Sequence, residues 1–493
     1  MAQANVGLSK KFTTLDPKSF SFYGFDGVPL RRMERRPRIA RIRCGAAAVA
    51  VVDDAIFVPS VRCRIPGHPK FRGGVVTPDG RPIALAHLRR GGGIVGGLTG
   101  PLAVEPQRDV DEEAIYLGWL FNHFGHFLLE SLARIWYLAQ ADPSVRVVFQ
   151  YPDPANPNAP EWAFRFLEAF GVPRHRIVVL DVPTRLRRMI VPEPLFELQF
   201  AAYEQAAQPY RAVASNVVGD AKPTTQPVYL SRRFLSTKQR MTVNEDELEE
   251  ILRDNGFLIV YPEKMSFEDQ VRLFNRHTDI FSTTGSAAHN VLFALNKPSL
   301  HILANELRFS PNYYLCSHLA GAPTTFINCL STRGLPRLDE AVRSTPDFIE
   351  LPKIVEYLSI RGYLTKPMGV SSVNVGAARQ DRYYETWLYT SVRSAIQRRA
   401  ALPAQVESQA LTYATSSWPV TSILAAYYAQ DGNSLKDDLV EQFITLLASE
   451  LDKSRLAALK SDVETMVKRV STRCSPATVQ RLAEVCRTVF SRP

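Results

Sequence analysis

The chain has 493 residues, too many for a single hydrophobic core, so we expect two or three domains. Hydrophobic residues make up 45% and charged residues 22%, shares typical of a soluble globular protein. The six cysteines form no CxxC pair, which argues against a zinc ribbon or a disulfide framework. The start has no apolar signal-peptide core, and the apolar run CGAAAVAVV is too short to span a membrane, so we expect a cytoplasmic protein.

The net charge of +10 suggests an anionic partner. Residues 31–43, RRMERRPRIARIR, hold seven arginines and one glutamate. This segment is either a solvated basic face or a docking site for anionic lipid or a phosphorylated substrate. No nucleic-acid recognition motif accompanies it, so we expect no nucleic-acid partner and, at most, peripheral contact with the inner face of a membrane.

The first half of the chain predicts an irregular α/β lobe, residues 1–222, whose elements become clear only near its end. The pattern predicts a helix at 122–140, a strand at 145–151, a helix through 170, and strands near 176–180 and 187–191. The polar, proline-bearing segment 219–227 reads as the linker to the next lobe.

The second lobe, residues 223–372, alternates strands and helices. Strands are predicted at 227–232, 257–261, 279–283 and 298–303, with helices at 244–256, from Ser266 to 275, and after Gly285. Asn244 and Ser266 are expected to cap their helices. Such alternation predicts a doubly wound parallel sheet.

Beyond about residue 372 the pattern is helical only. Leu439, Phe443 and Leu447 recur at helical spacing, which predicts a helical extension over 373–493. We expect this extension to pack on its own core or on a partner, such as a second copy of the chain.

A glycine turn between strand and helix is the first candidate site. In TTGSAAHNVLF (283–293), Gly285 would let the backbone turn, and the N–H groups of Ser286, Ala287 and Ala288 would face an anion such as a diphosphate. No Lys-Ser/Thr pair follows, which excludes a Walker-type loop. Arg232 and Arg240 leave the first strand of the same lobe, where a guanidinium suits a phosphate.

The second candidate is NHFGHFLLE (122–130). His126 and Glu130 are four residues apart and share one helix face, whereas His123 points elsewhere except for its i+3 relation to His126. The pair could be a metal site, a core histidine with its carboxylate partner, or a catalytic pair. A metal site is disfavoured because no third ligand and no HExxH pattern accompany it.

The order of these motifs resembles glycosyltransferase family 61 over roughly residues 115–305. The matching positions are Asn122, His126, Glu130, Ser231, Arg232, Arg240, Asn244, Glu245, Pro262, Glu263, Gln270, Gly285, Ser286 and Asn290. The resemblance implies two Rossmann-like lobes of the GT-B type and an inverting transfer that needs no metal or other cofactor. It also implies a nucleotide-sugar donor, UDP-linked in the commonest case, and a glycan or other hydroxyl acceptor. The family's usual histidine before the glycine turn is replaced here by Thr284, so that histidine's role does not transfer.

With the resemblance, His126 becomes the expected base and Glu130 its orienting partner, although the two roles could be exchanged. The residues expected to bind substrate are Asn122, Arg232, Arg240, Asn244, Glu263, Gly285, Ser286, Ala287 and Asn290. Two other classes stay open. One is a nucleotide- or phospho-ligand-binding protein without turnover, and the other is a basic scaffold protein.

Overall fold

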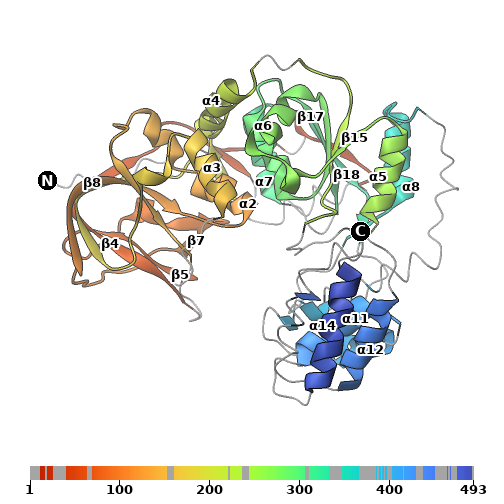
Figure 1. Ribbon diagram of the computed structural model, residues 1–493. Helices are drawn as coiled ribbons and strands as arrows, with labels where there is room; N and C mark the ends of the chain where they lie inside the picture. The colour runs from red at the N-terminus through yellow and green to blue at the C-terminus, as the bar shows by residue number, and fades with distance from the viewer. Residues whose placement is uncertain are drawn as a thin grey trace. The chain divides into compact units, whose positions relative to one another are not determined.

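The computed structural model divides into two compact units (Figure 1). Unit 1 comprises Met1–Leu230 and Lys264–Asn328, and unit 2 comprises Ser231–Glu263 and Cys329–Pro493. The structure describes residues 12–16, 19–25, 40–63, 69–152, 160–219, 222–235, 242, 244–305, 310–331, 347–365, 385, 388–389, 391–393, 395–396, 402, 404–414, 416–428, 437–449, 463–464, 467 and 475–490. Within these ranges no helix has the length and apolar character needed to cross a membrane. The mixed α/β class is confirmed, whereas the two-lobed arrangement and the boundaries near residues 222 and 372 stay predictions.

A mixed sheet forms the first part of unit 1. Its strand order is β10 (Ile177–Val179), β9 (Arg146–Gln150), β8 (Arg108–Trp119), β11 (Thr184–Pro192), β4 (Val49–Arg62), β5 (Phe71–Val76), β7 (Gly93–Gly96) and β6 (Leu88–Arg90). From β10 to β11 neighbouring strands are parallel, and β4 joins β11 antiparallel. The strands β4 to β7 were not predicted; they pair antiparallel except for β5 with β7, which is parallel.

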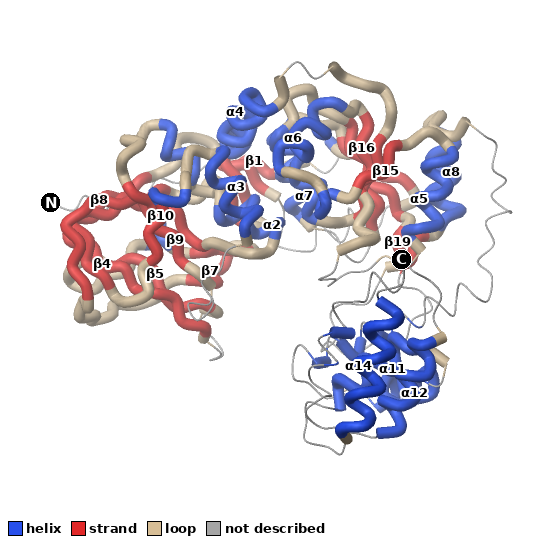
Figure 2. The backbone as a smooth tube through the Cα atoms, viewed as in Figure 1, coloured by secondary structure: helices blue, strands red, loops and turns tan. Residues whose placement is uncertain are grey.

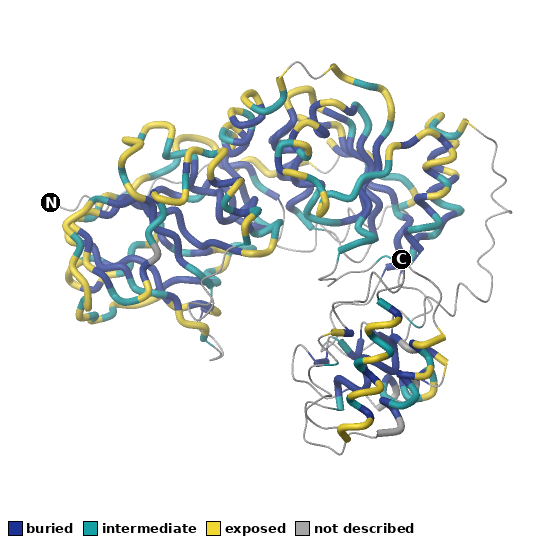
Figure 3. The backbone as a smooth tube through the Cα atoms, in the orientation of Figure 1, coloured by how far each residue is buried: buried dark blue, intermediate teal, exposed yellow. Residues whose placement is uncertain are grey.

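The long strand β8 has two distinct halves. Its first half is exposed, and its carboxylates pair with arginines of β11, for example Arg188 Nη1 with Glu113 Oε2 at 3.5 Å. Its second half, Ala114–Trp119, is buried throughout, as the dark tube in Figure 3 shows for much of this sheet's interior. A continuous apolar run of this kind is typical of a strand covered on both faces.

A smaller, separate sheet also belongs to unit 1. Its order is β1 (Phe12–Thr14), β3 (Arg41–Arg43), β13 (Ala201–Tyr203) and β12 (Phe196–Glu197). Arg41 and Arg43 of β3 therefore belong to a strand, while the rest of the basic segment, residues 31–39, lies outside the described residues.

The second large sheet includes the red strands around the label β16 in Figure 2, and the part of it that belongs to unit 1 is parallel. Its order there is β14 (Val228–Leu230), β16 (Asp279–Thr283), β17 (Ser299–Ala304), β18 (Thr324–Asn328) and β2 (Ser21–Tyr23). All four pairings are parallel. The predicted strands 279–283 and 298–303 are confirmed, but the edge strand β2 comes from the far end of the chain and was not predicted.

Helices and helical turns of unit 1 cover these sheets. They are η2 (Ala84–Ala86), α2 (Phe124–His126), η3 (Phe127–Ser131), η4 (Ile135–Ala139), α3 (Glu161–Ala169), η5 (Arg174–Arg176), η6 (Glu204–Ala207), α4 (Gln208–Val217), α6 (Phe267–Arg276), η8 (Ser286–Phe293) and α7 (Pro311–Ala320). The predicted cap of α6 is confirmed, since the Ser266 hydroxyl accepts from Asp269 N at 3.1 Å.

The single helix predicted at 122–140 is wrong. One α turn, α2, passes into the π-helical turn η3, in which Leu132 N donates to Phe127 O at 3.1 Å, and η4 follows after a bend. Two groups of this segment form hydrogen bonds with residues outside 122–140. Ser131 Oγ accepts from Phe121 N at 3.0 Å, and Ala133 O accepts from Leu195 N at 2.7 Å. These outside bonds replace the regular helical ladder.

Unit 2 contains the strand β15, a small two-stranded sheet and helices. The bounds are α5 (Glu245–Asp254), β15 (Leu258–Val260), β19 (Leu330–Ser331), β20 (Phe348–Ile349), α8 (Leu351–Ile360), α10 (Ala404–Ala414), α11 (Trp418–Tyr428), α12 (Asp437–Ala448) and α14 (Pro476–Phe490). Leu439, Phe443 and Leu447 are buried on α12, in a helical core of their own. Asn244 lies at the N-cap position of α5, as predicted, but its side chain makes no capping bond. Its side-chain amide instead makes two bonds to the backbone of Ile349. Asn244 Nδ2 donates to Ile349 O at 3.0 Å, and Ile349 N donates to Asn244 Oδ1 at 2.8 Å.

We expect Ser266→Ala to lower the free energy of unfolding by about 1 kcal/mol, because it leaves an N–H at the start of α6 without its acceptor. Urea denaturation measures the change. Ser215→Ala is the matched control: that exposed hydroxyl only bonds Arg211 O of its own helix, at 3.0 Å, so a change below about 0.5 kcal/mol is expected. Equal losses in both variants would contradict the cap's contribution.

Candidate active site

The buried carboxylate of Glu130 is hydrogen-bonded to two side chains, those of Arg90 and His126. Arg90 reaches it with two parallel bonds, Nε to Oε1 at 2.7 Å and Nη2 to Oε2 at 2.9 Å. His126 Nδ1 lies 2.6 Å from the same Oε2. The Glu130 side chain is only 2% exposed, against 25% for Arg90 and 33% for His126. The carboxylate is therefore enclosed, while the imidazole stays accessible.

Arg90 was missed by the sequence reasoning. It ends β6, forty residues before Glu130, and its guanidinium also lies 5.3 Å from the centroid of the Phe121 ring. In the sequence it is one of two arginines before three glycines, LRRGGG, and nothing there points to residue 130. Only the sheet brings the strand end to the helical turn.

The position of His126 is fixed by the turns on either side of it. It closes α2, and η3 carries Glu130 one turn further, so the predicted i,i+4 pair is confirmed even though the helix is not regular. The rings of Phe121 and His123 pack against the imidazole, with centroids at 5.4 and 5.0 Å. Because an ionised carboxylate only accepts hydrogen bonds, Nδ1 donates to Glu130, and in the neutral imidazole the lone pair then lies on Nε2.

The glycine turn lies directly against α2. A Cβ placed on Gly125 would be 2.9 Å from Cβ of Ser286, the first residue of η8. Both candidate segments recognised in the sequence, 122–130 and 283–293, are thus brought together within unit 1. This closeness requires a glycine at position 125.

Gly285 itself has φ −163° and ψ 167°, an extended conformation that any residue adopts. The expectation that glycine was needed there for a special turn is therefore wrong. The turn is held instead by Tyr313, whose hydroxyl donates to Gly285 O at 3.1 Å. Ser286 and Ala287 are half-buried at the start of η8, where N–H groups have no acceptor within the helix.

Polar atoms without a protein partner lie beneath this turn. Among the described residues, Thr283 Oγ1, His289 Nδ1 and Asn290 Oδ1 are buried and unbonded. Asn290 Nδ2 donates to Gln270 Oε1 at 2.8 Å, which fixes the amide. Burial, followed by the charges of nearby His123 and His126, lowers the pKa of His289 to about 4.

The other predicted substrate-binding residues are distributed as follows. Asn122 is exposed just before α2, and Arg232, Asn244 and Glu263 belong to unit 2. Arg240 lies outside the described residues. The Ser231-Arg232 segment is positioned by two buried carboxylates, with Glu245 Oε1 accepting from Arg232 N at 2.9 Å and Glu249 Oε1 accepting from Ser231 Oγ at 2.6 Å.

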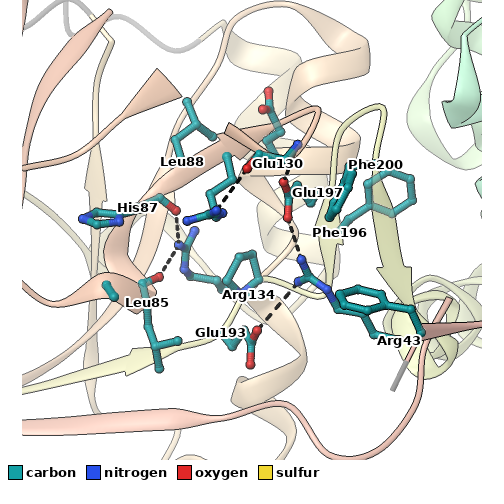
Figure 4. Close-up of a pocket in the computed structure, with 15 residues that line it drawn as sticks. Arg43, Leu85, His87, Leu88, Glu130, Arg134, Glu193, Phe196, Glu197 and Phe200 are labelled. Carbon is teal, nitrogen blue, oxygen red and sulfur yellow. Dashed lines mark hydrogen bonds and ion pairs between the residues drawn. The ribbon is translucent and has the colours of Figure 1, made fainter. Parts of the chain in front are cut away.

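A cavity of about 370 Å³ adjoins Glu130 within unit 1 (Figure 4). Arg134 is part of its lining and is itself buried, and its Nη2 donates to Leu85 O at 2.7 Å and His87 O at 3.2 Å. Arg43 enters from β3, with Nη2 at 2.6 Å from Glu197 Oε2 and Nη1 at 3.7 Å from Glu193 Oε1. In the described part of the chain, no group of three or more His, Cys, Asp or Glu side chains is arranged to hold a metal ion.

The comparison with protein families agrees with the motif order. The model of the family Glycosyltransferase 61 matches residues 124–300, and this match confirms the resemblance found in the sequence. The matched segment contains α2, η3 and the turn at η8. It supports a glycosyltransferase activity, with donor and acceptor substrates in general terms. No curated protein matches the chain.

We expect the stability of the protein to fall as the pH drops below 6.5. His289 has a depressed pKa in the folded chain, so the unfolded chain takes up a proton more readily between pH 6.5 and 4. Between pH 7 and pH 5 this residue alone should cost about 2 kcal/mol of stability. Burial lowers the pKa of His87, His277 and His318 too, which adds to the same trend.

Urea denaturation at pH 7 and pH 5 checks this expectation. His289→Gln should lose less stability than the wild type over this interval, because its amide takes up no proton. An equally steep loss in the variant would show that the buried imidazole does not titrate as described.

Proposed function

We propose that the protein transfers a sugar with inversion from a nucleotide-sugar donor, most simply a UDP-sugar, to a hydroxyl of a glycan or other acceptor. The family match supports the glycosyltransferase class. The proposal rests on one observation: the Arg90–Glu130–His126 arrangement lies beside the turn at Ser286. A proton acceptor and a site suited to an anion are thereby neighbours.

The contacts favour His126 over Glu130 as the base. Both oxygens of Glu130 accept from Arg90, one of them also from His126, and the carboxylate is almost completely buried. A base must reach the acceptor hydroxyl within hydrogen-bond distance. The His126 ring is partly exposed, and Nε2 of its neutral form can accept the proton, whereas both oxygens of Glu130 already accept hydrogen bonds.

The reaction then needs two movements of electrons. As the acceptor oxygen attacks the anomeric carbon, its proton passes to His126 Nε2. The bond from that carbon to the diphosphate oxygen breaks on the opposite face, and the leaving group takes the electron pair. Glu130 stabilises the imidazolium that forms. The two bonds from Arg90 hold the carboxylate in place, so the imidazole also keeps its position.

The N–H groups at the start of η8, where a helix supplies no acceptor of its own, suit the diphosphate. Backbone N–H groups and the positive end of a helical turn favour an anion without a cation as intermediary. We therefore propose that donor binding and transfer proceed without a divalent metal. Arg232, Arg240, Asn244 and Glu263 stay predicted substrate-binding residues, and this mechanism does not depend on them.

We expect His126→Ala to lower the rate of transfer by on the order of 10²–10⁴-fold, the range for loss of a general base, with little change in affinity for the donor. A screen of nucleotide sugars, run in EDTA, identifies the donor, and calorimetry with UDP measures its binding. His175→Ala, which removes an exposed histidine of η5, should leave the rate unchanged. A folded, fully active His126→Ala enzyme would refute the mechanism.

Gly125→Ala tests the closeness of the base to the turn. The added methyl would lie 2.9 Å from Ser286 Cβ, so α2 and η8 must separate. Because small displacements of catalytic groups are costly, we expect the transfer rate to fall about 10²-fold. Gly100→Ala is the matched control, since nothing lies within 4 Å of a Cβ there. Equal activity of the two variants would contradict the proposed arrangement.

A further inference from the structure

The cavity beside Glu130 has no role in the chemistry described so far. Its volume of about 370 Å³ falls within the range of small-ligand pockets, roughly 300–1,000 Å³. We propose that it binds a neutral sugar unit of the acceptor, one subsite away from the hydroxyl that reacts. This inference rests on the proposed function and specifies its acceptor.

Aromatic rings form one side of the cavity. Phe12, Phe196 and Phe200 line it, and the rings of Phe12 and Phe200 meet edge to face with centroids 6.2 Å apart. Figure 4 shows Phe196 and Phe200 together at the end from which Arg43 enters. Flat apolar faces beside a few fixed polar groups suit the C–H face of a sugar ring, whose edge carries the hydroxyls.

The charges around the cavity are balanced. Arg43, Arg89 and Arg134 line it together with Glu130, Glu193 and Glu197, so the wall carries no formal net charge. Arg43 is already paired with two carboxylates, and Arg134 is held by backbone carbonyls. Such a wall offers an ionic ligand no excess of opposite charge, which favours a neutral one.

One donor of this wall is unused. Arg43 is 8% exposed, and its Nε has no hydrogen-bond partner among the described residues. A hydroxyl group both accepts from a guanidinium and donates to a carboxylate. A polyhydroxylated ligand therefore matches a wall that contains both guanidinium and carboxylate groups.

The cavity shares Glu130 with the base. Glu130 is part of the lining, and His126 Nδ1 is 2.6 Å from Oε2 of that carboxylate. One side chain thus separates the cavity from the imidazole. A sugar bound in the cavity would align the rest of the acceptor with His126 while leaving the donor turn at η8 unobstructed.

The test compares two tryptophan substitutions. Ala84 lines the cavity and is exposed, so Ala84→Trp fills the cavity from its mouth without disturbing a core. Ala212, exposed on α4 and outside the lining, gives the control Ala212→Trp. The probes are the methyl glycosides of glucose, galactose, mannose and xylose, with methyl glucuronide as an anionic comparison. Binding is followed by ligand-observed NMR, and UDP binding is measured separately by calorimetry.

We expect at least one neutral glycoside to bind the wild type and Ala212→Trp equally, and Ala84→Trp at least about tenfold more weakly, with UDP affinity the same in all three. Phe200→Ala should weaken the same glycoside about two- to tenfold through loss of one ring face. Its retained UDP binding would show that the fold is intact.

Three results would overturn the inference: no neutral glycoside binds, Ala84→Trp binds as tightly as the wild type, or methyl glucuronide binds more tightly than the neutral glycosides. If Ala84→Trp loses glycoside binding but UDP binds to none of the three proteins, the cavity is still a binding site for a neutral sugar. The proposed binding of a UDP-linked donor is then wrong.

Discussion

A single buried carboxylate organises this protein. Removing Glu130 from water costs several kcal/mol, and that cost is offset only because the Arg90 fork and His126 meet its oxygens at close range. The end of strand β6 and the turn η3 must therefore lie side by side in the folded chain. The π-helical form of η3 fits this requirement, since such turns are frequent where a helix presents a functional side chain.

The same segment is held on its other side by aromatic packing. Phe127 packs on Trp162 with centroids 5.1 Å apart, and Phe166 of the same helix, α3, lies 4.1 Å from Phe267 of α6. These contacts link η3 to α3 and α3 to α6, all within unit 1. The spacing between the imidazole and the turn at Ser286 is thus set by a core rather than by flexible loops.

Local features of this site could be predicted and distant ones could not. The His126–Glu130 pair, the Ser266 cap and the strand at 279–283 follow from patterns within a few residues. Arg90 could not be found, because its partner is forty residues away and only sheet pairing brings them together. Asparagine is a residue type that often caps helices, yet the side-chain amide of Asn244 bonds the backbone of Ile349 instead.

Strand β2 has a consequence for how the chain is made. Ser21 pairs with Thr325, more than 300 residues later in the sequence. At about 5–20 residues per second, a ribosome needs roughly 15–60 seconds to produce that partner after β2. Until then β2 has no sheet to join, and its unpaired backbone groups are a hazard for association with other chains. Completion of the second sheet is therefore a late event in biosynthesis, because its edge strand is made among the first residues and its neighbour only after residue 323.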